Sequence, residues 1–248
     1  MQIVGVTLAL GVAFHFSRPY LRFSKKIDWH WVQKLLNFGK YAIGTNLGSM
    51  LYKGMDKMML GRMVSVASVA IYELAVKVTS LLDIPTLSAA PVVFPQSAIA
   101  SAKDGQVAAA NLYEKSVGLI LTIILPCIVV VQLVPELIIT IIGGAQYLDS
   151  IPLLRIVIFF GFFTPFLYQT GMVLESIGKP KINFYFTLFS FVLNLIFNAL
   201  FISLFGIVGA AYGTLLTYSI VFLIGQKMLH KLVGIQTSHV FYLSLIHI

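Results

Sequence analysis

Residues 184–202 read FYFTLFSFVLNLIFNALFI, and residues 207–228 read IVGAAYGTLLTYSIVFLIGQKM. Both segments are predominantly apolar, and each has the length of roughly 20 residues that a helix needs to cross a hydrocarbon core of about 30 Å. We therefore predict that Phe184–Ile202 and Ile207–Met228 each cross a membrane. This prediction decides the fold class, because the same pattern recurs along the chain.

Four apolar segments of similar length precede these two: Tyr41–Leu60, Val69–Val92, Val117–Ile138 and Ile151–Ser176. A shorter apolar run, Gln2–Phe16, is interpreted as the end of a helix whose beginning lies outside the sequence. The predicted fold is an all-α, polytopic transmembrane helix bundle with about six full spans and one truncated span. Its predicted parts are a truncated helix (1–16), a basic linker (17–40), a six-helix lobe (41–230) and a tail (231–248).

The composition excludes a soluble enzyme. Hydrophobic residues make up 58% of the chain, charged residues only 10%, and the mean hydropathy is +0.93. The net charge of +8 does not indicate a nucleic-acid partner, because no segment forms a basic cluster on a polar domain. Cys127 is the only cysteine, and the histidines lack ligand spacing, so we expect neither a metal site nor a cofactor.

The basic residues are distributed unevenly between the loops. Twelve of the seventeen lie in 17–40, 96–115, 178–182 and the segment after Gly225, whereas the alternate connections contain only Arg62. Loops that carry Lys and Arg stay on the cytoplasmic side. The distribution therefore predicts a cytoplasmic carboxyl terminus.

Two of these basic segments are predicted to form surface helices. Asp28 is placed to cap a short interfacial helix that contains Trp31, and 96–115 has the pattern of an amphipathic helix. Ser244–Ile248 is typical of translated adapter sequence, and we assign it no role. Four prolines are predicted to kink the second and third full spans or to loosen their ends: Pro85, Pro91, Pro95 and Pro126.

Charged residues also lie inside the predicted spans, where a charge at the helix centre costs about 2.5 kcal/mol or more. Lys53 and Lys57 share a helical stripe with Asn46, and a short turn places them near the charges of the second full span. We expect Lys53, Asp56, Lys57 and Glu73 to lie in the outer half of the membrane, where they can neutralise one another. The charged members of the two spans are Lys53, Asp56, Lys57, Glu73, Lys77 and Asp83.

Two interpretations of this cluster remain open. The first is a hydrated cavity wall with a surplus of basic groups, suited to an anionic headgroup such as a diphosphate. The second is an ion-pair network that holds the two helices together, with Lys53 bound to Asp56 or Glu73 bound to Lys77. Lys57 and Arg62 lie near the membrane edge, and we expect their side chains to extend to the headgroup region.

Polar stripes follow the fourth and fifth full spans, and such stripes either line water or form hydrogen bonds with a neighbouring helix. In the fifth span the stripe consists of Asn183, Thr187, Ser190, Asn194 and Asn198. In the fourth span the stripe consists of Gly161, Thr164, Tyr168, Gly171 and Glu175. Gln169 lies beside this stripe, and Arg155 lies at the external end of the span. The G-x-x-x-G spacing from Gly209 to Gly213 predicts close helix packing.

With these residues in view, the chain resembles the carboxyl-terminal half of the Wzx-type polysaccharide flippases, in the superfamily that also contains multidrug extruders and lipid II flippases. The resemblance rests on short motifs in family order: Asp56-Lys-Met-Met-Leu-Gly61, Val69-Ala-Ile-Tyr72, Val93-Phe-Pro95, Gly144-Ala-Gln-Tyr147, Leu153-Leu-Arg155, Gly178-Lys-Pro-Lys181 and Phe205-Gly-Ile-Val-Gly-Ala-Ala211. It implies one lobe of a two-lobed bundle that works by alternating access. The amino-terminal lobe that would complete the cavity is then missing from this sequence.

The function implied by the resemblance is non-enzymatic transport of a polyprenyl-diphosphate-linked oligosaccharide across a bacterial or archaeal cytoplasmic membrane. The expected partners are this lipid-linked oligosaccharide, membrane lipids and the missing lobe. No cofactor is implied, and H⁺ or Na⁺ coupling through Asp56 or Glu73 is a further expectation. The candidate residues of the substrate path are Lys53, Asp56, Glu73, Lys77, Arg155, Gln169, Asn194 and Asn198.

Three other functions remain as alternatives. A cation-coupled multidrug extruder of the same superfamily is expected to favour carboxylates over basic residues in its cavity. A membrane-embedded glycan polymerase or ligase needs a large external loop with catalytic groups, and the external connections here are short. A structural membrane subunit would use the polar stripes only for packing.

Overall fold

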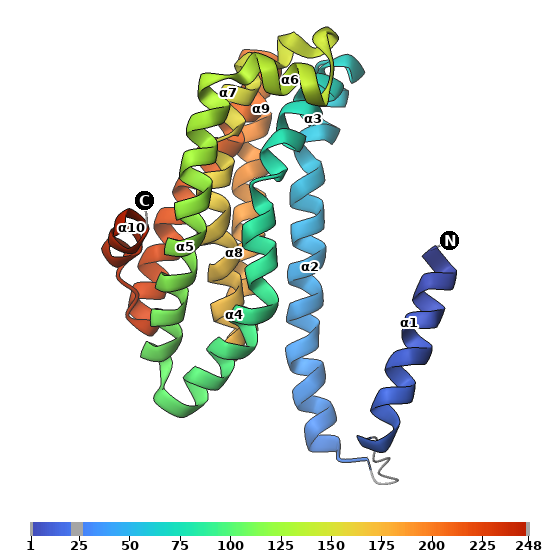
Figure 1. Cartoon of the computed structure of the whole chain (residues 1–248), viewed down its shortest axis with the longest axis vertical. Helices are drawn as coiled ribbons and strands as arrows, with labels where there is room; N and C mark the ends of the chain where they lie inside the picture. The colour runs from blue at the N-terminus through green and yellow to red at the C-terminus, as the bar shows by residue number, and fades with distance from the viewer. Residues whose placement is uncertain (1, 21–26, 247–248) are drawn as a thin grey trace. The chain divides into compact units, whose positions relative to one another are not determined.

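The computed structural model describes residues 2–20 and 27–246, and within them every regular element is helical. This confirms the all-α prediction. The chain divides into two compact units, 1–39 and 40–248. The smaller unit contains α1 (Gln2–Ser17) and the short 3-10 helix η1 (Arg18–Tyr20). The larger unit contains the later helices of the chain (Figure 1).

Helix α2 (Trp29–Met63) begins in the smaller unit and continues into the larger one. Asp28 caps it as expected, because an Asp28 side-chain oxygen accepts the backbone N–H of His30 at 3.0 Å. The prediction of a separate, short interfacial helix is wrong. Residues 29–40 have no helix-breaking proline, so the helix continues through the first predicted span.

The second predicted span, Val69–Val92, is not one helix. It is divided between α3 (Val66–Ser80) and α4 (Asp83–Asp104), and the break lies at Leu81 and Leu82. Pro85 lies in the first turn of α4, where its missing N–H and its ring are tolerated, whereas they would interrupt a continuous helix. The kink predicted from Pro85 is thus confirmed as a break, and Pro91 and Pro95 remain inside α4.

The predicted amphipathic helix over 96–115 is also divided. Helix α4 ends at Asp104 and α5 (Gln106–Leu133) begins after Gly105, whose φ of +81° is a conformation that glycine adopts readily. Beyond α5, the chain forms α6 (Pro135–Ile142), the 3-10 helix η2 (Ala145–Ser150), α7 (Ile151–Val157) and α8 (Phe160–Ser176). The prediction of a single span over 151–176 is therefore replaced by a pair of helices that bend by 50°.

Helix α9 (Pro180–Val233) is a helical hairpin rather than a rod, because Gly206 has φ 58° and ψ −136°. A Cβ on Gly209 would lie 1.9 Å from the carbonyl oxygen of Phe201, and a Cβ on Gly225 would lie 3.1 Å from the ring of Phe186. The two limbs, 180–205 and 207–233, therefore pack closely against each other. The close approach predicted from the G-x-x-x-G spacing is confirmed.

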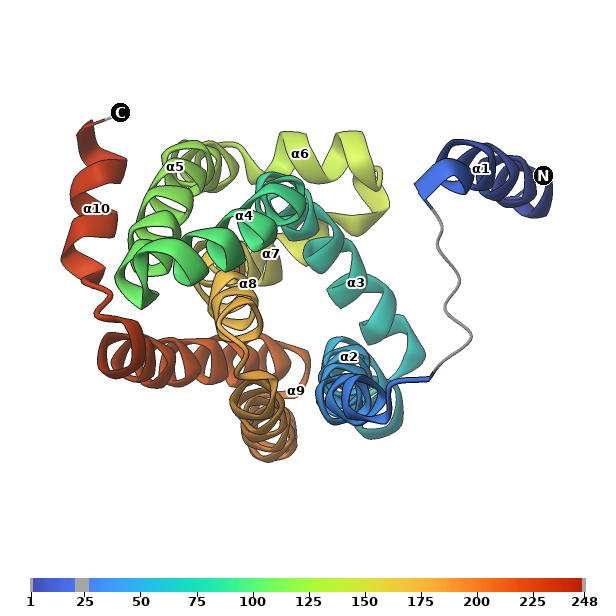
Figure 2. The same ribbon diagram turned by 90° about the horizontal axis from the view of Figure 1, so that it is seen from below.

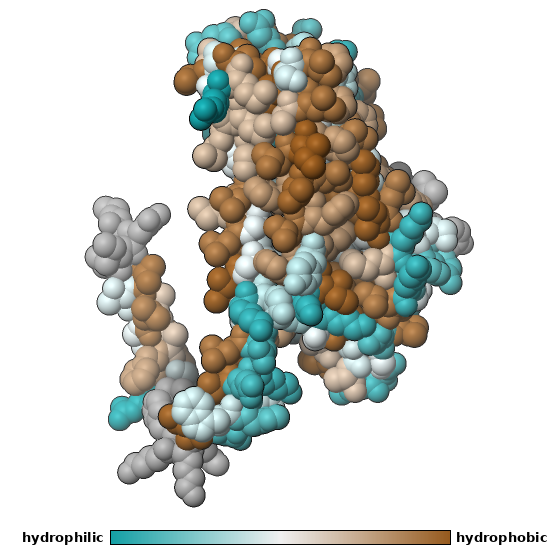
Figure 3. All heavy atoms as spheres, turned by 180° about the vertical axis from the view of Figure 1, so that it is seen from behind, coloured by the Kyte–Doolittle hydropathy of each residue, from teal (hydrophilic) through white to brown (hydrophobic). Residues whose placement is uncertain are grey.

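Helices α4, α5, α8 and α9 form the body of the larger unit, and α10 (Thr237–Ile246) packs against α5 (Figures 1 and 2). By length and hydropathy alone, α5 and α9 are able to cross a membrane, and the bent pair 145–157 and 160–176 makes a third candidate within the described residues. Figure 3 shows hydrophobic side chains over the middle of one face of this unit and hydrophilic side chains toward its upper end. The protein is a multi-pass membrane protein.

Candidate functional site: a charged cavity wall beside a sealed polar cluster

Three cavities lie in a row between α2 and the helices α4, α8 and α9. We call them the upper, middle and lower cavities, with volumes of about 280, 200 and 260 Å³. The upper and middle cavities share Lys53, Asp83 and Tyr218 among their lining residues. The middle and lower cavities share Tyr168 and Asn183. Neighbouring cavities share lining residues, so the three lie one after another along α2, and we call this row the path.

Asp56 on α2 is the centre of a polar cluster at one side of the upper cavity. The hydroxyl of Tyr72 on α3 donates to Asp56 Oδ2 at 2.9 Å, and the hydroxyl of Thr214 on α9 donates to the same oxygen at 3.1 Å. The side-chain amide of Asn198 donates to Asp56 Oδ1 at 2.6 Å. One carboxylate therefore joins three helices.

The two limbs of α9 extend this cluster. Asn194 donates to Thr214 Oγ1 at 3.0 Å, and Asn198 donates to Asn194 Oδ1 at 3.0 Å. Asn194 and Asn198 are both 0% exposed, and Thr214 and Tyr72 are buried. We call Asp56, Tyr72, Asn194, Asn198 and Thr214 the sealed polar cluster.

The sealed polar cluster is built for a carboxylate. Tyr72, Asn198 and Thr214 all donate to Asp56, and an ionised carboxylate only accepts hydrogen bonds. Hydrogen bonds to a charged group contribute about 1.5–3 kcal/mol each. Three such bonds offset much of the cost of placing this charge among transmembrane helices.

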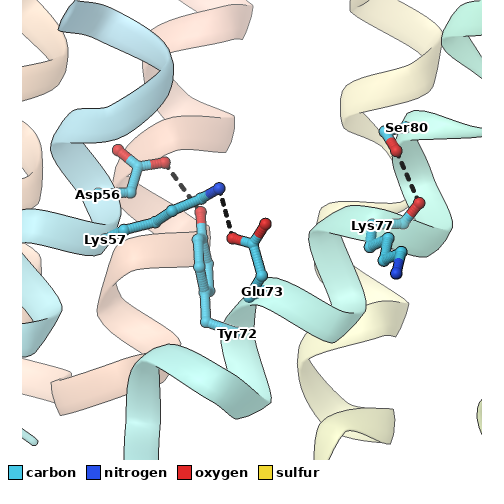
Figure 4. A network of polar contacts seen from close by, with 6 residues as sticks. All are labelled: Asp56, Lys57, Tyr72, Glu73, Lys77 and Ser80. Atoms are coloured by element: carbon cyan, nitrogen blue, oxygen red, sulfur yellow. Dashed lines mark hydrogen bonds and ion pairs between the residues drawn. The ribbon is translucent and has the colours of Figure 1, made fainter. Parts of the chain in front are cut away.

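The opposite side of the upper cavity is lined by more exposed charges, and Figure 4 shows Lys57 extending from α2 toward Glu73 on α3. The Lys57 ammonium and Glu73 Oε2 form an ion pair, and their side chains are 37% and 44% exposed. This corrects one expectation, because Glu73 pairs with Lys57 rather than with Lys77. That the Lys57 side chain reaches the headgroup region stays a prediction.

Lys53 lies one turn before Lys57 and lines both the upper and middle cavities. Its charge attracts the carboxylate of Asp83, which lines the same two cavities. The expected pair between Lys53 and Asp56 is not formed, since Asp56 is occupied by the sealed polar cluster. Lys53, Lys57, Glu73, Lys77 and Asp83 together are called the charged wall.

The expectation of a basic surplus in this cavity is not met by the lining residues. They include three lysines and three carboxylates: Lys53, Lys57, Lys77, Asp56, Glu73 and Asp83. Lys77 is exposed, and within the described residues no carboxylate lies within ion-pair distance of its ammonium group. Lys53 likewise forms no ion pair within the described residues, so the upper cavity presents two unpaired amines, while its formal charges balance.

Arg155 and Gln169 lie apart from this site. Arg155 is exposed on α7 and lines none of the three cavities, and its backbone carbonyl accepts a hydrogen bond from Gln132 at 2.8 Å. Gln169 is 0% exposed on α8, and its side-chain atoms have no hydrogen-bond partner in the described part of the chain. Of the eight candidate residues, the structure brings together the other six.

The polar stripe of the fifth predicted span divides between two environments. Its carboxyl-terminal half, Asn194 and Asn198, belongs to the sealed polar cluster, whereas Thr187 and Ser190 line the middle cavity. Asn183 lines the middle and lower cavities and donates to Glu175 Oε1 at 2.9 Å. Both readings of the stripe, packing and cavity lining, are thus correct for different residues.

Sequence reasoning missed Tyr72 and Thr214 as partners of Asp56, as well as an aromatic pair that lines both the upper and the middle cavities. Tyr52 and Tyr218 stack with ring centroids 6.1 Å apart and an interplanar angle of 13°. Thr214 lies sixteen residues after Asn198, so only the hairpin at Gly206 brings the two together. The sequence did contain one signal for this contact. Thr214 and Asn198 lie at similar distances on either side of the turn at Gly206, so a hairpin there brings the hydroxyl of Thr214 close to the amide of Asn198.

Comparisons with known proteins agree with this architecture. The family described as "Polysaccharide biosynthesis protein" matches residues 3–152. The "Probable low-salt glycan biosynthesis flippase Agl15" of Haloferax volcanii is 26% identical over 215 residues, which cover 87% of this chain and 46% of that protein. The "Teichuronic acid biosynthesis protein TuaB" of Bacillus subtilis is 26% identical over 235 residues, which cover 86% of this chain and 44% of that protein.

A solved multidrug resistance MATE family transporter of the MOP superfamily, in an outward-facing conformation, has the same fold. The TM-score is 0.80 at 16% sequence identity, and the likeness covers 92% of this chain and 54% of that transporter. The chain thus spans about half the length of the curated relatives and of the solved transporter it matches.

Proposed function

The chain belongs to the polysaccharide biosynthesis protein family, and we propose that it forms the carboxyl-terminal lobe of a flippase for a polyprenyl-diphosphate-linked oligosaccharide. The observation that carries this proposal is the path of three cavities along α2, with a charged upper end and a lower end rich in amides and hydroxyls. A second lobe facing α2 would close the path, and alternating access of the two lobes would move the cargo across the cytoplasmic membrane.

The two ends of the path suit different parts of such a cargo. Lys77 and Lys53, which form no ion pair among the described residues, offer amines to the oxygens of a diphosphate. The lower cavity is lined by Asn46, Asn183 and Tyr168, and amide groups with an aromatic face are suited to the hydroxyls and ring faces of a sugar. The diphosphate and the glycan are therefore proposed to lie at opposite ends of the path.

We assign coupling to H⁺ or Na⁺, if it operates, to Asp56 rather than to Glu73. Glu73 is already paired with Lys57 and is 44% exposed. Asp56 is surrounded by Thr214, Asn194 and Asn198, and Asn198 Oδ1 is a buried oxygen without a donor in the described part of the chain. A carboxylate with neutral oxygens nearby is the kind of ligand set that hard cations prefer.

The test measures flipping of a fluorescent polyprenyl-diphosphate-linked sugar in proteoliposomes that contain the chain together with its proposed partner lobe. We expect Lys53→Gln and Lys77→Gln each to reduce the initial rate at least fivefold, because each removes an amine from the cavity. Arg155→Gln tests whether the earlier expectation for Arg155 holds, and its position outside the cavities predicts a smaller effect. Lys103→Gln, on an exposed helix end, is the matched control.

Equal rates in wild type and in the Lys53→Gln and Lys77→Gln variants would contradict the proposal. The second candidate function is a multidrug extruder, which the equal number of carboxylates in the upper cavity favours. In the same vesicles, efflux of a cationic dye that is lost in Asp83→Asn but unaffected by Lys77→Gln would support that alternative.

A further inference from the structure

A fourth cavity, of about 480 Å³, lies where α9 ends and α10 begins, and the proposed function makes no use of it. Its walls come from the last turns of α9, the connection over 234–236 and the first residues of α10, whose helices appear together in Figure 2. The lining residues are Gln226, Lys227, His230, Lys231, Ile235, Gln236, Thr237 and Ser238. We call this the α9–α10 pocket.

Hydrogen bonds hold the walls of this pocket in place. The Gln226 side chain donates to the Tyr113 hydroxyl at 2.6 Å and accepts from the Thr237 hydroxyl at 3.1 Å. The backbone N–H of Gln236 donates to Glu114 Oε1 at 2.6 Å. These bonds fix α10 to α5 and α9, so the pocket is formed before any ligand arrives.

The charges that line the pocket are all positive. Lys227 and Lys231 are one helical turn apart, and His230 lies on the same face of α9. Among the described residues no carboxylate lines the pocket or pairs with either lysine. The nearby Glu114 is engaged by the Gln236 N–H and by His239 Nδ1 at 3.3 Å, so it is occupied by partners of its own.

The amino terminus of α10 also suits an anion. His230 Nδ1 lies 2.8 Å from the carbonyl oxygen of Ile235, and this contact holds the imidazole beside the connection over 234–236. Thr237 and Ser238 belong to the first turn of α10, where backbone N–H groups have no acceptor within the helix and the helix dipole is positive.

We propose that the α9–α10 pocket binds a phosphate group, carried by the headgroup of an anionic membrane lipid. Lysines at the end of a spanning helix also occur simply to orient it, but that role requires neither a preformed pocket nor a second helix with its amino terminus facing the same space. The apolar limb 207–233 leads directly to the pocket, so lipid headgroups are the phosphate groups nearest to it. Free phosphate shares the same chemistry, and the experiment distinguishes the two sources.

The experiment measures binding of phosphatidylglycerol and of phosphatidylcholine, with identical acyl chains, to the purified chain by native mass spectrometry in detergent. We expect wild type to bind phosphatidylglycerol at least tenfold more tightly than phosphatidylcholine. The double variant Lys227→Gln with Lys231→Gln should lose this preference. The variant with arginine at both positions should keep it, which separates loss of charge from loss of folding.

The matched control replaces Lys179 and Lys181 by glutamine, which removes the same charge at another loop. If this control loses the preference as fully as the pocket variant, or if wild type shows no preference, the proposal is overturned. Inorganic phosphate is tested as a competitor. Competition that depends on Lys227 and Lys231 identifies free phosphate as a second source, whereas lipid binding without competition assigns the pocket to lipid headgroups alone.

Discussion

The sealed polar cluster and the charged wall are neighbours on α2, yet their charged groups have different partners: neutral hydrogen-bond donors in the cluster and an opposite charge in the wall. Asp56 directs its carboxylate into part-buried hydrogen bonds with three donors, whereas Lys57, the next residue, forms a half-exposed ion pair with Glu73. Successive residues of a helix point about 100° apart, so adjacent charges face different surroundings. The comparison teaches that the number of charges in a span says less about function than the partners each charge finds.

Asp56→Asn is the most direct way to break this comparison. The amide presents an N–H where the cluster supplies only donors, so at least one of Tyr72, Asn198 and Thr214 loses its acceptor. We expect the free energy of unfolding to fall by about 3 kcal/mol. Thermal unfolding in detergent, followed by intrinsic fluorescence, measures the loss. Asp149→Asn, at an exposed position, is the control, and an equal loss there would contradict the assignment.

Gly209→Ala sharpens the comparison by disturbing the hairpin that delivers Thr214 to the sealed polar cluster. The added Cβ would lie 1.9 Å from the Phe201 carbonyl oxygen, so the two limbs of α9 must separate. We expect a loss of about 1–3 kcal/mol in the same unfolding measurement. Gly54→Ala is the matched control, because its Cβ meets no atom within 4 Å. Comparable stability of the two variants would show that the close packing of the limbs is not needed.

Glu73→Gln tests the charged wall. Of the three substitutions, we expect it to change the free energy of unfolding least. Lys57 loses its partner but remains 37% exposed and can be hydrated. We expect a change in unfolding free energy of less than about 1 kcal/mol. If Glu73→Gln lowered the free energy of unfolding as much as Asp56→Asn, the charged wall would be no more accessible to water than the sealed polar cluster.

The sequence was informative about which residues are polar inside the membrane and less informative about how they pair. The apolar segments predicted a helical, multi-pass chain, although 69–92 and 151–176 are each divided between two helices, and the G-x-x-x-G spacing predicted the close packing at Gly209 and Gly213. The partner of Asp56 could not be read from the sequence, because Asn198 is 142 residues away and Thr214 is 158 residues away. Helical spacing constrains residues within one span, whereas partners across the bundle depend on how the spans pack.

The sequence predicted which segments are helical better than it predicted where the helices are interrupted. Pro85 was expected to kink a span, but the division at Leu81 and Leu82 also depends on the helix-terminal bonds there, in which Leu82 N–H bonds to the Thr79 carbonyl at 2.9 Å. Gly105 and Gly206 end or fold helices through their positive φ angles, while Gly54 lies in a regular helix. Composition alone does not separate these roles, because each depends on the local backbone.

The hairpin of α9 has a consequence for the order in which the protein assembles. Asn194 and Thr214 are only twenty residues apart, so their hydrogen bond needs only the two limbs of the hairpin. Asp56 precedes this hairpin by more than a hundred residues, and two of its three donors, Asn198 and Thr214, belong to the hairpin. The Asp56 carboxylate therefore gains most of its hydrogen bonds only when the hairpin packs against α2.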